Sequence, residues 1–487
     1  MALNVWRDPP TQEAIMRAAS LLTALSLATL ATLASCSDQD AATFPVKARP
    51  SFTVYTASAG AGVILGPWNT SNYTIAYGIN DLGTISGVSD ITTGVRWETG
   101  TAAAPASTTA LLVDNAGAIG RDVNLVGQIA GERGGHAALW TPSGGGYVLT
   151  DIGSLFAGAV SSAAYGINAS GQVVGNYAVF NGPTLVSKCF LWRPDVPNGS
   201  VGTAVTLLDL GGTFCVGNDI NTSGQIAGTS TSTAAFSPNH AVVWSTSLSP
   251  TELLPGPDES YGAGINDAQQ VAGFHTPQAG PRTAALWTPN GANTWSLLDL
   301  VAPGFGQPGV IESQSFDVDD AGFVVGYSYP QGVGTSGRAF FWQNGAFTEL
   351  TDPVGAPVVE AVALTNLIGN LAIVTGADIF DLNNNGRHGL RWAVTLTPVT
   401  SQGCLADLRQ LISDLRGSGA ISAGEATSLL AKVDAATRQA DQGRTTPAKN
   451  VLYALINEVN AMRASGRLSS ADAQALIDAA QCAIAAV

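Results

Sequence analysis

The sequence predicts a mainly β protein, a seven-bladed β-propeller followed by a small four-helix bundle. Three observations predict this fold. A turn motif recurs seven times between residues 61 and 400, and a phrase that ends in Trp follows each copy. From Cys404 onward the apolar spacing changes from every second residue to the spacing of a helix. The chain has 487 residues, of which 45% are hydrophobic, so it can bury a large core.

The turn motif reads A-x-G-I-N-x-x-G-x-x-x-G, as in Ala76–Gly87 and Ala164–Gly175. An Asn side chain that accepts a backbone N–H opens a turn, and Gly supplies the positive φ that the turn requires. The motif therefore predicts two strands joined by a tight turn, repeated roughly every 48 residues. The residues at the key position of the seven copies are Asn80, Asn124, Asn168, Asn221, Asn266, Asp319 and Asn366.

The second phrase places one large aromatic residue in each unit, and a short apolar run often follows it. Because this residue recurs once per unit, we interpret it as a wedge that packs between units and not as a ligand platform. Each unit then holds up to four strands, and seven such units fit a propeller. The phrase ends at Trp97, Trp140, Trp192, Trp244, Trp287, Trp342 and Trp392.

Ring closure is expected from an extra strand at Gly62–Leu65, which would pair with the last blade near His388–Leu396. A closed ring leaves no unpaired sheet edge that could aggregate. A β-solenoid or a stack of β-sandwiches is the alternative architecture.

The alternation of the GIN-x-x-GQVVG and HA-x-LW phrases resembles the HAF repeats of probable extracellular bacterial proteins, although no strict His-Ala-Phe triplet occurs. Arg338-Ala339-Phe340 comes nearest to it. The resemblance covers residues 61–400. It implies an extracellular setting and no defined reaction.

Residues 1–35 are expected to be a lipoprotein signal peptide, because Arg17 precedes an apolar run of small residues. Leu33-Ala34-Ser35-Cys36 resembles a bacterial lipobox, in which Cys36 carries the lipid. Residues 36–60 would form a tether, and translation would start at Met1 or Met16. A transmembrane anchor and a plain cleavable signal are the alternatives. The protein is thus expected to be exported and lipid-anchored at the cell surface or outer membrane, with no other membrane contact.

The net charge of −15 and the pI of about 4.5 argue against a nucleic-acid partner. Acidic surface attracts divalent cations or basic partners, and it also keeps a protein soluble.

Binding residues are expected on the loops between the second and third strands, because these loops vary in length on a rigid scaffold. The extracellular ligand, a surface protein or a glycan, cannot be read from the sequence. The turns between the first and second strands are short and regular, so their face is expected to be structural. The candidate binding residues are Tyr177, Phe180, His275, Tyr327 and Tyr329.

Two patterns suggest a metal. His136, His240 and His388 occupy the same repeat position on different blades, so we expect hydrogen bonding and not a shared ion. Asp381, Asn383 and Asn385 open a calcium-loop pattern, and calcium is the one cofactor considered. Trp392 stands where such a loop carries its bidentate Glu, and an Asn-rich turn is the alternative. No other cofactor is expected.

No metalloprotease, nucleophile-elbow, phosphate-loop or CxxC motif occurs, so no catalytic residue is assigned. We expect a non-catalytic binding scaffold. A carbohydrate-active propeller enzyme, a lyase or glycosidase, and a purely structural envelope protein are the alternatives.

The four cysteines other than Cys36 would lie in an oxidising compartment. Two disulfides are the economical pairing, Cys189 with Cys215 and Cys404 with Cys482, and free buried thiols are the alternative.

Residues 404–487 show helical spacing, as in Leu405, Leu408, Ile412 and Leu415, and Ser422 with Glu425 predicts a capping box. Four helices with short loops predict an up-down bundle. Residues 455–461 and 465–469 resemble the FIMAH domain of secreted bacterial proteins, which implies an accessory role without a catalytic residue.

Overall fold

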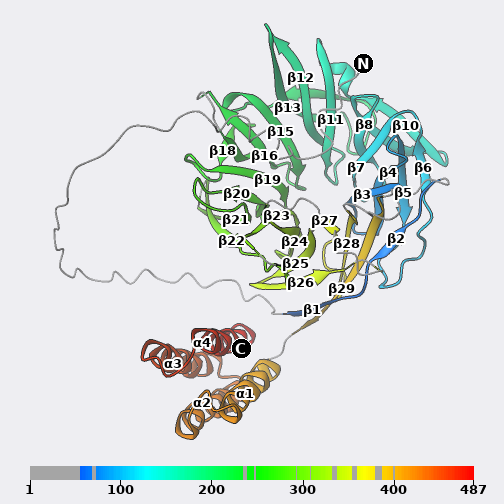
Figure 1. The fold of residues 1–487 in the computed structure, drawn as a ribbon. Helices are drawn as coiled ribbons and strands as arrows, with labels where there is room; N and C mark the ends of the chain where they lie inside the picture. The colour runs from blue at the N-terminus through cyan, green and yellow to red at the C-terminus, as the bar shows by residue number, and fades with distance from the viewer. Residues whose placement is uncertain are drawn as a thin grey trace, which may run out of the picture. The chain divides into compact units, whose positions relative to one another are not determined.

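The computed structural model describes residues 55–487 except 69–72, 234–237, 246–247, 292, 308, 332–336, 352, 354–358, 379–386 and 399–400. Its strands form six four-stranded antiparallel sheets and one five-stranded sheet, arranged around an axis as a seven-bladed propeller (Figure 1). Four helices follow in the chain. The predicted fold class is therefore confirmed. The predicted signal peptide, Cys36 and most of the predicted tether lie outside the described residues.

Each blade contains consecutive strands in chain order, except for the seventh. The bounds are β3 Thr74–Ile79, β4 Thr84–Ser89, β5 Thr93–Glu98 and β6 Leu111–Asp114; β7 Ala118–Val123, β8 Ile129–Arg133, β9 His136–Ser143 and β10 Gly146–Asp151; β11 Ala159–Ile167, β12 Val173–Asn181, β13 Thr184–Pro194 and β14 Gly202–Thr206; β15 Gly211–Ile220, β16 Ile226–Ser232, β17 Asn239–Trp244 and β18 Pro250–Glu252; β19 Glu259–Ile265, β20 Val271–Thr276, β21 Thr283–Gly291 and β22 Thr294–Leu300; β23 Ile311–Val318, β24 Val324–Pro330, β25 Arg338–Gln343 and β26 Ala346–Leu350; and β27 Val359–Leu364, β28 Leu371–Asp378 and β29 Gly389–Pro398, joined by β1 Tyr55–Ala59 and β2 Val63–Leu65.

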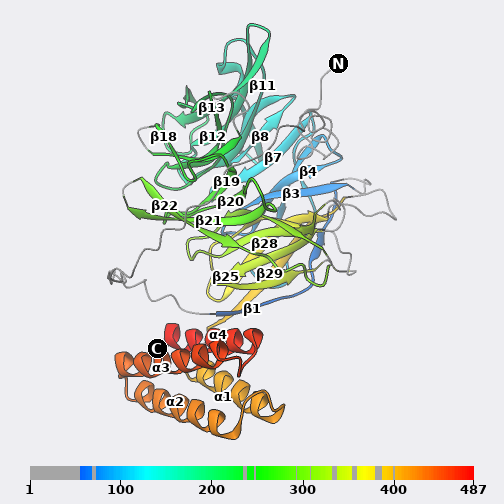
Figure 2. The same cartoon turned by 60° about the vertical axis from the view of Figure 1, so that its left-hand side comes forward.

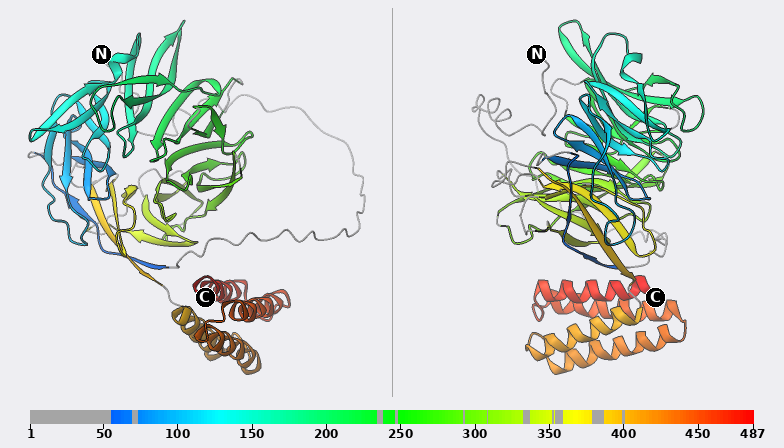
Figure 3. Two further views of the ribbon diagram at one scale, coloured as in Figure 1. Left: turned by 180° about the vertical axis from the view of Figure 1, so that it is seen from behind. Right: turned by 90° about the vertical axis from the view of Figure 1, so that its right-hand side faces the viewer.

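The first strand of every blade lies next to the axis and contacts the first strands of both neighbouring blades, so that β27 of the last blade also contacts β3 of the first. Figure 3 shows the same ring from behind and from the side. The inner strands therefore surround the axis completely.

The ring closes through the N-terminal strands, as the sequence predicts. Strand β2 pairs with the start of β29 (Val63 opposite Arg391), and β1 pairs with its end (Ala57 opposite Leu396). Strand β1 lies in the segment predicted to be a tether, so the propeller begins at Tyr55, before the predicted boundary at residue 61. The blade that ends the chain of repeats thus obtains its outer strands from the beginning of the chain.

The repeated Trp side chains are wedges between blades. All seven are at most 5% exposed. Trp244 packs with Val174 and Leu191 of the preceding blade, and Trp392 packs with Val325 and Phe341 of its own preceding blade. This confirms the packing role that their spacing predicts.

The repeated tryptophans pack alike, but they differ in whether the indole N–H has a hydrogen-bond acceptor. The indole N–H of Trp244 donates to the Leu208 carbonyl at 2.6 Å, whereas no described residue accepts from the buried N–H of Trp287. We expect Trp244→Phe to cost about 1 kcal/mol more stability than Trp287→Phe, since only the first loses a hydrogen bond. Urea unfolding of the two variants measures the difference, and equal losses would contradict this role of the bond.

The C-terminal segment folds into helices α1 Ser401–Gly417, α2 Ala423–Asp441, α3 Thr445–Ala464 and α4 Ser470–Ala486. Their apolar faces form one core, and the disulfide Cys404–Cys482 joins α1 to α4. The capping box of Ser422 and Glu425 is present. The described helices include none that is long and apolar enough to cross a membrane.

Candidate functional site

The five residues predicted to bind a ligand lie on three different blades, within the second strands and not in the loops that follow. Tyr177 and Phe180 belong to β12, His275 to β20, and Tyr327 and Tyr329 to β24. The loop placement is wrong because each second strand continues past the Gly that ends the turn motif.

Four of the five aromatic side chains are engaged within the protein. The Tyr177 hydroxyl lies 2.7 Å from Thr206 Oγ1. The His275 ring is 6% exposed, and its Nε2 lies 2.8 Å from Asp299 Oδ1. The rings of Tyr327 and Tyr329 stack at 5.2 Å, and Gln314 Nε2 donates to both hydroxyl groups. The structure therefore does not bring the five residues together into one site.

Phe180 is the exposed member of the set, at 63%, and it lies near the end of a long hairpin formed by β12 and β13. Leu185 stands directly opposite Phe180 and is 51% exposed. Val160 of β11 and Leu155 are 54% and 50% exposed. Figures 1 and 2 show β11 and its neighbours projecting beyond the adjacent blades. We call these four residues, Leu155, Val160, Phe180 and Leu185, the blade-3 patch.

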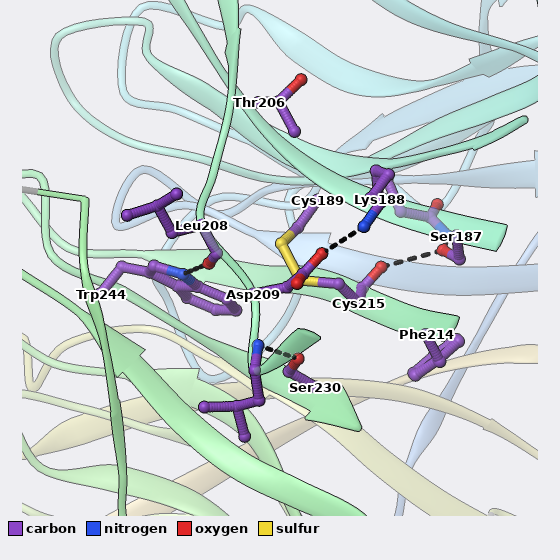
Figure 4. Close-up of a disulfide and its surroundings, with 12 residues drawn as sticks. Ser187, Lys188, Cys189, Thr206, Leu208, Asp209, Phe214, Cys215, Ser230 and Trp244 are labelled. Carbon is purple, nitrogen blue, oxygen red and sulfur yellow. Dashed lines mark hydrogen bonds and ion pairs between the residues drawn. A yellow bond between two sulfur atoms is a disulfide. The ribbon is translucent and has the colours of Figure 1, made fainter. Parts of the chain in front are cut away.

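The hairpin below the patch is braced. Its turn has only two residues, and Gly182 there adopts a φ of 61°, which a residue with a side chain rarely takes. The Phe156 and Tyr177 rings stack at 4.2 Å. At its base the disulfide Cys189–Cys215 links β13 to β15 of the next blade, and Ser187 Oγ donates to the Cys215 carbonyl at 2.9 Å (Figure 4). The patch therefore sits on a stiff support.

Charge is missing from this part of the chain. Residues 152–187 contain no Asp, Glu, Lys or Arg, although the whole chain has 57 such residues. The first charged residue after them, Lys188, is paired with Asp209 at 2.7 Å. An exposed apolar surface is typical of a contact site for another molecule.

At the other end of the first strands, the turn motif forms a ring of hydrogen bonds. Oδ1 of Asn80 accepts the backbone N–H groups of Leu82 and Thr84, as the predicted turn requires. Its Nδ2 group donates to the Asn124 carbonyl of the next blade at 2.8 Å. The Asn residues at 124, 168, 221 and 266 repeat this inter-blade bond. The Asn therefore has a second role, joining blades, which the motif alone did not reveal.

The seventh copy departs from the predicted alignment. Leu364 pairs with Val374 as Ile79 pairs with Ile85, so Thr365 and not Asn366 occupies the turn position. Asn366 lies one residue later and donates from its backbone N–H and Nδ2 to the two carboxylate oxygens of Asp81. The turn of this blade is longer, which shifted the sequence alignment by one residue.

A β-bulge interrupts every first strand just before the turn, and its extra residue is half-buried near the axis. Arg121 of blade 2 lies 5.3 Å and 5.1 Å from the ring centres of Tyr77 and Tyr165. Burial raises the pKa of Tyr261 of blade 5 to about 12, with a further contribution from Tyr165 of blade 3. The bulge residues are Tyr77, Arg121, Tyr165, Asn218, Ala263, Phe316 and Val362.

Every second blade carries an Asp next to its bulge. Asp122 Oδ2 accepts the Ile167 N–H of the following blade at 2.9 Å, and Asp219 and Asp317 make the same bond to Ile265 and Leu364. Burial, followed by the charge of Asp219, raises the pKa of Asp122 to about 7 and that of Asp317 to about 8. Burial also raises the pKa of Asp219. These carboxyl groups hold blades together.

Stability should therefore fall as the pH rises from 5 to 9. The folded-state pKa values of Asp122 and Asp317 lie above the unfolded value of about 3.9. Their stabilising contribution is complete below the unfolded value and is lost as the pH rises through 7 to 8. Thermal unfolding across this range measures the slope. The double variant Asp122→Asn/Asp317→Asn should show a shallower slope, and an unchanged slope would contradict this assignment.

The three repeated histidines lie on three different blades, as their repeat position predicts. His136 Nδ1 lies 3.1 Å from Asp151, His388 Nδ1 lies 2.7 Å from Asp378, and His240 is buried in β17. Among the described residues, no group of three or more His, Cys, Asp or Glu side chains could hold one ion. Asp381, Asn383 and Asn385 of the predicted calcium loop lie outside the described residues.

The fold and its surfaces define the chain as a β-propeller protein with a C-terminal helical domain. Residues 405–485 match the FIMAH domain model. A comparison with curated proteins finds no match.

Among solved structures, a gluconolactonase from Xanthomonas campestris is 13% identical, with a TM-score of 0.34, and the match covers 70% of this chain and 100% of that chain. A luciferin-regenerating enzyme is 10% identical, with a TM-score of 0.34, over 69% of this chain and 97% of the other. A protein of unknown function from Dyadobacter fermentans is 11% identical, with a TM-score of 0.38, over 70% and 99%. Matches at this distance say nothing about the activity of this chain.

Proposed function

We propose that this protein is an exported, lipid-anchored recognition scaffold of the HAF-repeat kind, which binds an extracellular polymer through the blade-3 patch without catalysing a reaction. The observation that carries the proposal is the patch itself: the exposed Phe180 and Leu185 of the braced hairpin, with the exposed Val160 of β11 and Leu155 of the preceding 3-10 turn, in a stretch of the chain without charged residues. Burial of such a surface against a partner is favourable, at roughly 25 cal/mol per Å² of apolar area.

The acidic side chains near the axis support a non-catalytic role. Each carboxylate of Asp122, Asp219 and Asp317 accepts two backbone N–H groups, one from its own blade and one from the next. A general acid or base must reach the substrate atom with which it exchanges a proton. These three groups are instead committed to holding the ring.

A glycan array tests the recognition role, with uncharged glycans as the first class of ligand. Wild-type protein should bind, and Phe180→Ser/Leu185→Ser should lose at least tenfold in affinity, since two exposed contact side chains are removed. Val301→Ser is the matched control, because Val301 is 75% exposed and lies outside the patch. Equal binding by wild type and the double variant would refute the patch. Release of products would favour the carbohydrate-active alternative, and no binding at all would favour a purely structural role.

The anchor is tested separately. Substitution of Cys36 by Ala should abolish labelling of the chain by a radioactive fatty acid and release it from the membrane fraction, if Cys36 is the lipid-bearing residue. Labelling that persists would contradict the lipobox prediction. The localisation outcome does not affect the glycan test, which uses purified protein.

A further inference from the structure

A second candidate site lies at one end of the propeller axis, on the opposite face from the β12–β13 hairpin of the blade-3 patch. A cavity of about 210 Å³ lies among the turns between first and second strands, on the face that the sequence predicts to be chiefly structural. The described residues that line it include five carboxylates and no Lys, Arg or His. The carboxylates are those of Asp81, Asp122, Asp267, Asp319 and Asp320.

The acidic groups gather on one side of the ring. In the residue that follows the key turn position, blades 1, 5 and 6 carry Asp81, Asp267 and Asp320, whereas blades 2, 3 and 4 carry Leu125, Ala169 and Thr222. Asp267 Oδ1 accepts the Thr222 N–H, and Asp320 Oδ1 accepts the Asp267 N–H, both at 2.9 Å. Both residues are exposed, so their second oxygens remain available to a ligand.

Asp319 provides an independent observation. It occupies the position where five other blades have Asn, and its Oδ1 accepts the N–H groups of Ala321 and Phe323 as those Asn side chains do. The five Asn side chains each donate from Nδ2 to the next blade, but a carboxylate has no such proton. Asp319 is 4% exposed, lines the cavity, and its Oδ2 has no partner among the described residues. A buried acceptor without a donor is costly, so this oxygen points to a cationic donor from outside.

The arrangement suits an organic cation better than a metal ion. A metal needs several ligands converging at about 2 Å, and the described residues include no such group of three. An alkylammonium group instead offers three N–H donors and a chain that can lie along the Ile79 and Val318 side chains of the same cavity. We propose that this axial cavity binds a primary alkylammonium group, carried by a polyamine or by a lysine side chain of a polypeptide.

Calorimetric titration of the full chain with spermidine, and separately with the peptide Ala-Lys-Ala, tests the proposal in slightly alkaline buffer. One of the two probes should bind with a stoichiometry of one, and which probe binds identifies the source of the ammonium group. Calcium chloride is added in a parallel titration, to test whether calcium competes with the bound probe. Absence of binding by both probes, or their displacement by calcium from the same site, would overturn the proposal.

Three variants make the test specific to the cavity. Asp267→Asn and Asp320→Asn keep the Oδ1 acceptor that each turn uses, so the fold should survive while ammonium binding weakens about fivefold for each. Asp319→Asn restores the side chain of the other blades, so it should weaken binding and also raise the unfolding temperature. Asp407→Asn is the matched control, because Asp407 is an exposed residue of α1 with the same charge. Equal weakening by the control would mean nonspecific charge attraction and would refute the site. None of these outcomes depends on whether the blade-3 patch binds a glycan.

Discussion

Deletion of residues 55–65 is expected to unfold the propeller cooperatively. This change removes β1 and β2, which supply the outer strands of the seventh blade. It also removes Leu65, which is 0% exposed and packs with Trp97 and Ile373. The deletion leaves one edge of β29 unpaired, and an unpaired edge invites aggregation. We expect a loss of more than about 5 kcal/mol, measured by urea unfolding, together with higher oligomers in size-exclusion chromatography.

A point variant in β2 distinguishes the contribution of side-chain packing from that of strand pairing. Leu65→Ala should cost about 2–5 kcal/mol, because it leaves a cavity between the first and seventh blades. Ile64→Ala is the control, because Ile64 is 41% exposed, and this variant should cost under 1 kcal/mol. A deletion variant that unfolds at the wild-type urea concentration would show that the N-terminal strands do not close the ring.

The second large effect is expected at the Gly that ends each turn motif. A Cβ atom at Gly273 would lie 1.8 Å from the Tyr261 carbonyl oxygen and 3.1 Å from the Trp287 ring. The strands cannot separate there, because Gly273 is paired with Gly262 in the ladder. We therefore expect Gly273→Ala to destabilise the protein by about 3 kcal/mol or more, measured by thermal and urea unfolding.

Gly60→Ala is the matched control for this substitution. No atom of the described residues lies within 4 Å of a Cβ added at Gly60, so Gly60→Ala should change stability by no more than about 0.5 kcal/mol. If Gly273→Ala were as stable as wild type, the close packing of Trp against the second strand would not be the reason for the repeated Gly.

Much of the fold could be predicted because residues within each single repeat determine it. The Asn and Gly of the turn, the buried Trp and the alternation of the strands depend on neighbours within one unit. Asn80 and Trp97 therefore have the environments expected from sequence. The closing strand at Gly62–Leu65 could be found because it lies outside the seven units and still has strand character.

The candidate sites could not be predicted in the same way, because they depend on differences between repeats. The bulge that contains Tyr77 leaves only a weak signal in the sequence. In a regular strand one residue would separate two buried positions on the same face, but here two residues separate the buried Ala76 and Ile79. The inter-blade role of Asn80 requires knowing which carbonyl faces its amide. The sequence predicts a loop at His275, but β20 extends to Thr276 and His275 is buried within it.

The blade-3 patch illustrates the same limit. The sequence predicts Phe180 as a binding residue from its position in the repeat, and its exposure follows from the length of the β12–β13 hairpin, whose strands are longer than β16 of the next blade. The partners Leu185 and Val160 were missed. The run of residues 152–187 without a charge was a signal in the sequence that could have drawn attention to them.

The closed seven-bladed ring supports both proposed sites, and disulfide trapping tests it most directly. Ala57 and Leu396 are cross-strand partners between the first and last strands of the propeller. In the double variant Ala57→Cys/Leu396→Cys, the two Cβ atoms should lie near the 3.5–4.5 Å that a disulfide requires, at about the separation of cross-strand pairs. Mild oxidation should then join them, as intact mass and a gel shift would show, while the out-of-register pair Ala57→Cys/Val394→Cys should remain largely unlinked. Failure of the in-register pair to link, or equal linking of both pairs, would contradict the closed ring.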